Sequence, residues 1–176
     1  MCGHFALKAP PAKLASYFGL DEVADFAPRY NIPPGTDIPV IRQSPEHRRV
    51  LHLLRWGLVP HWSKDPSVGA KLNNARGESV AEQPSFRDAF KRRRCLIPAD
   101  GFYEWKTEGK IKLPYYISLK SGEPMAMGGL WESWKPPADE IQSLVRPYDA
   151  EAMQAWPVDR RVSKAADDDA RLIEPV

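Results

Sequence analysis

A cysteine in the second position gives this sequence its most unusual chemical group. Removal of Met1 would leave Cys2 with an α-amine and a thiol on adjacent carbons. Reference pKa values of about 7.7–8.0 for the amine and about 8.5 for the thiol make both partly nucleophilic near neutral pH. The amine can condense with an aldehyde to an imine, and the thiolate can then close a five-membered thiazolidine on the same carbon. Judged by its position alone, Cys2 could instead be a small buried hydrophobic residue.

Two further polar positions could assist such chemistry. Glu104 lies between the aromatic residues Tyr103 and Trp105, so we expect a desolvated carboxylate suited to proton transfer. The alternative is an ion pair on a solvated sheet face. Asn74 and Arg76 are two residues apart and would share a face if that stretch is extended.

Composition narrows the class of protein. The chain has 176 residues, which suits a single domain spanning 1–176. Its two cysteines exclude a disulfide scaffold and a Cys-rich zinc site, and its four histidines lack metal-ligand spacing, so we expect no metal and no cofactor. No apolar run approaches the ~20 residues of a membrane span, and we expect a cytoplasmic protein with no membrane partner.

Charge is divided unevenly along the chain. Residues 1–94 hold 15 Lys/Arg and 9 Asp/Glu, whereas residues 95–176 hold 10 and 14. The first part could therefore bind a polyanion, although charge also drifts this far by chance. The basic run at 91–94 could extend such a surface or could simply be a solvated helix end.

Hydrophobic spacing predicts an α+β fold of many short strands in a curved, barrel-like sheet with a few peripheral helices. Helices are expected within 11–25, 85–94 (with Ser85 as N-cap) and 149–156. Strands are expected at 38–41, 50–56, 95–98, 101–106, 113–119, 124–131 and 157–162, and the strand at 50–56 is expected to be central because it is so apolar.

Seven short blocks, taken in order, resemble the SRAP family, the SOS-response-associated peptidases. They are MCG at 1–3, RYNIPPG at 29–35, RWGLVP at 55–60, NARGE at 74–78, ADGFYEW at 99–105, GGLW at 128–131 and PVDRRV at 157–162. Each block is weak alone, but together they span nearly the whole chain.

The resemblance implies a monomeric covalent sensor of abasic sites in single-stranded DNA, associated with the nucleoid when bound. It implies that Cys2 is the nucleophile, that Asn74 holds the N-terminus or the adduct, and that Glu104 is the general acid and base. It also implies a DNA-binding set: His4, Asn31, Pro34, Trp62, Arg76 and Trp105. Aromatic members of that set could stack on bases.

The sequence departs from the family pattern in two places. His4 stands where the family has arginine, which replaces a permanent cation by a titratable ring. A family segment that carries a catalytic histidine has no counterpart, so we expect either a spatial break near 141/142 or a true deletion. A peptidase acting through Cys2 and a non-covalent binder of single strands are therefore alternative functions.

Overall fold

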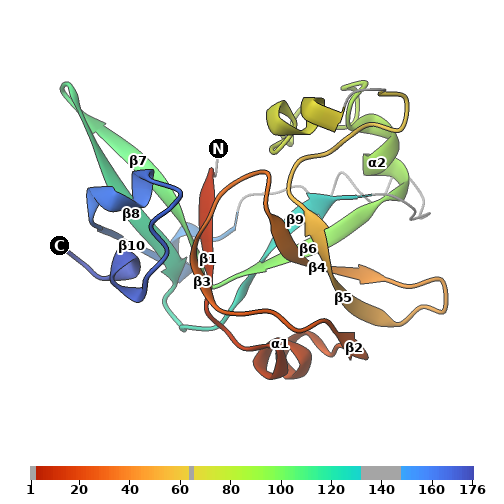
Figure 1. Cartoon of the computed structure of the whole chain (residues 1–176), viewed down its shortest axis with the longest axis horizontal. Coiled ribbons are helices and arrows are strands. Elements are labelled where there is room, and N and C mark those ends of the chain that lie inside the picture. Colours follow the sequence, from red (N-terminus) through yellow and green to blue (C-terminus); the bar gives the residue numbers. More distant parts are fainter. Residues whose placement is uncertain (1–2, 64–65, 132–147) are drawn as a thin grey trace.

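The computed structural model describes residues 3–63, 66–131 and 148–176, and these form two five-stranded sheets with few helices (Figure 1). The first sheet has the order β10-β8-β7-β1-β3 and the second the order β2-β5-β4-β6-β9. All pairings are antiparallel except that of β2 with β5. The expected α+β class with short strands is confirmed.

The strands of the first sheet are β1 (His4–Leu7), β3 (Arg29–Ile32), β7 (Gly101–Glu108), β8 (Ile111–Leu119) and β10 (Met153–Pro157). Those of the second are β2 (Glu22–Val23), β4 (Asp37–Gln43), β5 (Arg49–Arg55), β6 (Arg94–Ala99) and β9 (Met125–Leu130). The helices are α1 (Pro11–Phe18), α2 (Arg87–Arg92) and the 3₁₀ turns η1 (Pro66–Lys71), η2 (Ala150–Ala152), η3 (Arg160–Ser163) and η4 (Ala170–Ile173).

The chain crosses from the second sheet to the first at Asp100, between β6 and β7. The buried Asp100 carboxylate accepts hydrogen bonds from the backbone N–H groups of Lys8 (2.6 Å) and Ala9 (2.8 Å). The backbone N–H of Asp100 donates to the carbonyl of Ala6. These bonds tie the end of β1 to the crossing point. A buried carboxylate satisfied by backbone N–H groups in this way is a structural anchor.

Two buried clusters flank the first sheet. One fills the space toward the second sheet and includes Phe5, Leu7 and Ile32. The other lies under the C-terminal segment (residues 157–173), where Val158, Val162 and Leu172 pack against strands β1, β7 and β8. The side chains of β1 alternate between these clusters, as the period of two in a strand requires.

The segment from 149 to 162 corrects two expectations. Instead of a helix over 149–156, a single turn η2 leads into β10, which pairs with β8 from Met153 opposite Leu119 to Pro157 opposite Tyr115. Instead of a strand over 157–162, the 3₁₀ turn η3 follows. Edge pairing in the sheet overrides the helical propensity of an Ala- and Glu-containing stretch.

Two smaller expectations also change. Phe86, and not Ser85, occupies the N-cap position of α2, because a turn at Gln83 delays the start of the helix. Strand β5 is not central, since only the two-residue β2 lies beyond it, and only Val50 and Leu51 of its seven residues are buried. The predicted break near 141/142 lies outside the described residues.

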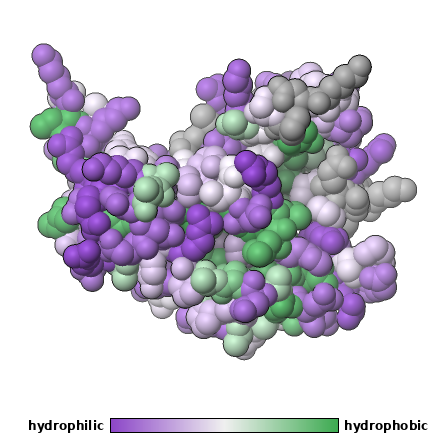
Figure 2. All heavy atoms as spheres, in the orientation of Figure 1, coloured by the Kyte–Doolittle hydropathy of each residue, from purple (hydrophilic) through white to green (hydrophobic). Residues whose placement is uncertain are grey.

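The surface reflects this arrangement. Figure 2 shows mostly hydrophilic residues over β7, β8 and the C-terminal turns, and hydrophobic residues gathered near β4 and β5. Within the described ranges, none of the helices is both long and apolar enough to cross a bilayer.

Candidate functional site

The pairing of β1 with β7 is the frame of the site. His4 lies opposite Tyr103, and Phe5 lies opposite Phe102. Residues directly opposite in an antiparallel pair share a face, and the faces alternate along the strand. One face, here called the groove face, therefore carries Phe5, Phe102 and Glu104. The other, here called the capped face, carries His4, Tyr103 and Trp105. The predicted catalytic residue Glu104 therefore lies on the opposite face from the predicted DNA-binding residues His4 and Trp105.

On the groove face, Phe5 lines a cavity of about 1280 Å³ between the second sheet and the loop that follows η1. Its wall includes Phe5, Trp56, Asn73 and Asn74. Glu104 is half-buried on the face that Phe5 and Phe102 share, with Tyr103 and Trp105 on either side along the strand. The desolvated setting expected for this carboxylate is thus partial. Asn74 lies on the wall of this cavity, whereas Glu104 is not among the residues that line it.

Trp56 organises this side of the molecule, although it was not among the predicted site residues. Its indole packs edge-on against Phe5, with ring centroids 5.3 Å apart, and its Nε1–H donates to the carbonyl of Asn73 at 2.7 Å. Its backbone bonds to Gly35 and Thr36 at 2.8 and 2.9 Å. One buried residue therefore holds the Asn73–Asn74 stretch and the turn that contains Pro34. Its place in the RWGLVP block is the only signal that could have revealed it.

The capped face holds three of the predicted DNA-binding residues. His4 Nδ1 lies 2.5 Å from Asn31 Oδ1, and the His4 ring meets Trp105 edge-on at 6.0 Å. Asn31 is only 1% exposed, and its Nδ2 donates toward the carbonyls of Val162, Lys164 and Asp167. The side chain of Asn31 is thus occupied inside the protein, which favours a supporting role over direct contact with DNA.

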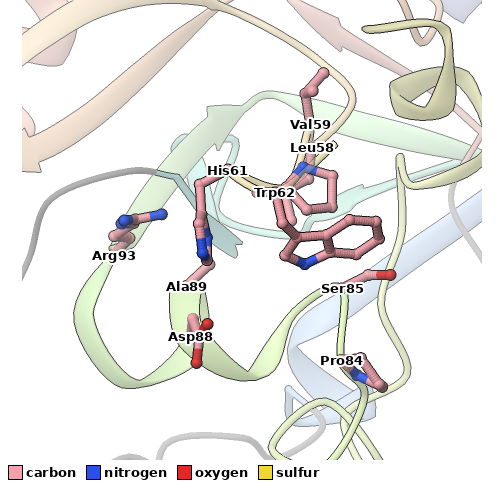
Figure 3. Close-up of a pocket in the computed structure, with 10 residues that line it drawn as sticks. Leu58, Val59, His61, Trp62, Pro84, Ser85, Asp88, Ala89 and Arg93 are labelled. Atoms are coloured by element: carbon pink, nitrogen blue, oxygen red, sulfur yellow. The ribbon is translucent and has the colours of Figure 1, made fainter. Parts of the chain in front are cut away.

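Trp62 and Arg76 lie at the surface. Trp62 is 56% exposed and lines a shallow pocket with His61, Ser85 and Arg93. Figure 3 shows its indole on the side of Ser85, and the His61 ring on the side of Arg93. An exposed indole near a guanidinium group can stack on an unpaired base, and contact with DNA at Trp62, Arg76 and Pro34 stays a prediction.

The structure describes one of the two cysteines, Cys95, and shows why its thiol is unreactive. Cys95 is buried in β6, and burial raises the pKa of its thiol to about 12, so it is protonated and unreactive near neutral pH. Cys2 lies outside the described residues.

Burial also raises the pKa of Tyr103 and Tyr116, whose phenols stay neutral. Across the described ranges, no group of three His, Cys, Asp or Glu side chains could hold a metal ion.

Comparison with known proteins defines the class to which this fold and site belong. Residues 1–143 match the family model described as SOS response associated peptidase (SRAP). The chain therefore belongs to the SRAP family.

Individual relatives carry more specific names. The chain is 33% identical over 223 residues to abasic site processing protein YoqW of Bacillus subtilis, covering 99% of both chains. It is also 33% identical over 153 residues to YedK of Escherichia coli, an abasic site processing protein, covering 82% of this chain and 66% of that one. The YoqW alignment is longer than this chain's 176 residues, so that relative contains residues with no counterpart here.

The fold has solved counterparts. A crystal structure of a protein from Bacteroides thetaiotaomicron superposes with a TM-score of 0.84 at 23% identity, covering 99% of this chain and 100% of the other. At that identity the likeness concerns the fold.

Proposed function

We propose that this protein processes abasic sites in DNA, and that it does so in single strands by forming a covalent adduct through Cys2. Its relatives named abasic site processing proteins support the first part. The second part rests on the chemistry of an N-terminal aminothiol, which requires that Met1 has been removed. The ring-opened form of an abasic deoxyribose is an aldehyde, which is the reaction partner of that group.

The proposed reaction balances as a condensation. The Cys2 amine adds to the aldehyde carbon, and the resulting carbinolamine loses water to give an imine. The thiolate then adds to the same carbon, forming a C–S bond while the nitrogen takes up a proton. The net change joins the aldehyde and the aminothiol into a thiazolidine and releases one water, with no oxidant or reductant. A proton moves from nitrogen to oxygen when the carbinolamine forms and again when water leaves, and from sulfur to nitrogen when the ring closes; a carboxylate can carry such transfers.

The pairing of His4 with Tyr103 carries this proposal. Only Gly3 separates Cys2 from the start of β1, and Glu104 directly follows the partner of His4 on β7. Strand pairing therefore supports Glu104 as the proton-transferring group. The cavity wall that Asn74 shares with Phe5 supports Asn74 as a hydrogen-bonding partner of the N-terminus or the adduct. Cys95, protonated in the core, leaves Cys2 as the reactive thiol of this sequence.

DNA would reach this site along the exposed side of the groove. Trp62 offers a stacking surface and Arg76 offers a cation. Trp56 connects the turn with Pro34 to the Asn73–Asn74 stretch that precedes Arg76. We expect DNA affinity to fall steeply with added salt because phosphate contacts release counterions. A flat salt dependence would contradict a basic groove.

A single oligonucleotide experiment tests the function. The purified protein, with removal of Met1 checked by intact mass, is incubated with a uracil-containing single strand pretreated with uracil glycosylase. We expect a heat-stable crosslink on a denaturing gel, its loss in Cys2→Ala and its retention in Cys95→Ala. Binding without a crosslink would replace the proposal by a non-covalent binding module. Peptide cleavage that Cys2→Ala abolishes would instead support the peptidase activity in the family's description.

A further inference from the structure

The amide of Asn31 is fixed in one orientation by its surroundings. Its Nδ2 faces three backbone carbonyls of the C-terminal segment, those of Val162, Lys164 and Asp167, at 3.2, 3.1 and 3.0 Å. Rotating the amide by half a turn would place its oxygen against three carbonyl oxygens, with no proton between them. Oδ1 must therefore be the atom that faces His4, and Oδ1 can only accept a hydrogen bond.

That orientation decides which nitrogen of His4 carries a proton. His4 Nδ1 lies 2.5 Å from Asn31 Oδ1, so Nδ1 must be the donor. In the neutral ring one nitrogen is protonated and the other is an acceptor, so the lone pair belongs to Nε2. The edge contact with Trp105, at an interplanar angle of 76°, holds the ring plane.

The C-terminal segment also forms hydrogen bonds with the backbone of β3, the strand that carries Asn31. Asp168 Oδ1 accepts from the N–H groups of Tyr30 at 2.6 Å and Asn31 at 3.0 Å, and Arg29 pairs with the same carboxylate at 3.6 Å. Tyr103, opposite His4, donates its hydroxyl to the carbonyl of Tyr30 at 2.6 Å. The segment farthest from the N-terminus in sequence thus sets the hydrogen bonding of the fourth residue.

We propose that Asn31 is a positioning residue that holds His4 as the Nδ1–H tautomer and so presents Nε2 as a proton acceptor for the reaction at Cys2, two residues away. This inference deepens the proposed function and rests on it for the reaction. The tautomer itself does not depend on that function. A proton released by the terminal amine before it attacks the aldehyde would pass to Nε2, leaving a neutral amine and a charged ring.

The tautomer can be measured directly. Long-range ¹H–¹⁵N spectra of ¹⁵N-labelled protein, recorded where all four histidine rings are neutral, distinguish protonated from unprotonated ring nitrogens, and His4→Gln assigns the His4 signals. We expect a protonated Nδ1 and an unprotonated Nε2 at His4. In Asn31→Ala the Nε2–H form, which free histidine favours, should dominate. A wild-type ring protonated at Nε2 would overturn the proposal.

Asp168→Ala is the matched control. It removes a grip of the C-terminal segment on β3 but leaves the Asn31 side chain beside His4. Both Asn31→Ala and Asp168→Ala should lower the melting temperature, but only Asn31→Ala should change the tautomer. A change of tautomer in both would indicate general loosening of the segment and contradict a specific role for Asn31.

Crosslinking rates then test the link to the reaction. His4→Gln and Asn31→Ala should slow adduct formation by about 10²-fold, the lower end of the effect of a positioned proton-transfer group. Asp168→Ala should stay close to wild type at a temperature where it is folded. If the tautomer is as expected but both variants react at the wild-type rate, the role of His4 in the reaction is wrong. If wild type forms no adduct, the proposed function fails while the tautomer assignment stands or falls by the spectra.

Discussion

The two faces of the β1–β7 pair are held in different ways. On the capped face, Val162 and Leu172 are fully buried, and side chains of Asn31 and Asp168 bond directly to backbone groups. On the groove face, the single residue Trp56 holds two loops around a large cavity. One face therefore stabilises the strand pair, while the other keeps polar side chains accessible. Apart from His4 and Asn31, which we propose to act in the reaction, changes on the capped face should thus alter stability, and changes on the groove face should alter activity.

The largest expected effect is on the groove face. Glu104→Gln should slow crosslinking by about 10²–10⁴-fold because the amide cannot transfer protons, while the melting temperature stays near wild type. Single-turnover rates on an abasic single strand measure it. Glu108→Gln, at the exposed far end of the same strand, is the control and should react normally. Equal rates for all three proteins would remove Glu104 from the mechanism.

The next largest effect is a loss of stability on the capped face. A Cβ on Gly101 would lie 2.4 Å from the Tyr116 ring and 2.6 Å from the backbone oxygen of Ile117, so Gly101→Ala must displace a packed core. We expect about 3 kcal/mol of lost unfolding free energy by urea denaturation. A Cβ on Gly128, in β9, would meet no atom within 4 Å, so Gly128→Ala should be close to neutral. Similar stability of the two variants would contradict the packing described for this face.

Two tryptophans, one on each face, allow the same substitution to be compared on both faces. Trp56 Nε1 donates to the Asn73 carbonyl on the groove face, and Trp156 Nε1 donates to the Ile173 carbonyl on the capped face at 2.9 Å. Trp56→Phe and Trp156→Phe should each lose about 1 kcal/mol of unfolding free energy. Only Trp56→Phe should also slow crosslinking, because only it loosens the stretch next to Asn74. Equal slowing by both would break the distinction between the faces.

The smallest effect concerns the stability of the C-terminal segment at acid pH. The Arg161 guanidinium, 3.0 Å away, and the backbone N–H of Arg171 hold the pKa of Asp169 at about 2, below its ordinary 3.8. A lowered folded-state pKa stabilises the fold above the ordinary value and loses that contribution as pH falls from about 4 to 2. Asp169→Asn should therefore show a shallower loss of stability over that window in thermal melts. An unchanged pH profile would mean that the exposed pair contributes nothing.

Much of the fold could be predicted from local pattern. Strands β6 to β9 followed from their apolar residues, and α1 followed from the spacing of apolar residues within 11–25, although the helix ends at Phe18. The segment at 149–162 could not be predicted, because its conformation depends on the unpaired edge of β8. Local propensity contains no information about a pairing partner more than 30 residues away.

The candidate site divides in the same way. The residue types at positions 2, 74 and 104 specify the chemistry by themselves, since an aminothiol, an amide and a carboxylate have those properties in any fold. The separation of Glu104 from His4 and Trp105 on two faces, the anchoring by Trp56 and the fixed amide of Asn31 were decided only when β1 paired with β7 and the C-terminal segment closed over one side. Those contacts join residues far apart in the chain, and burial made their hydrogen bonds obligatory.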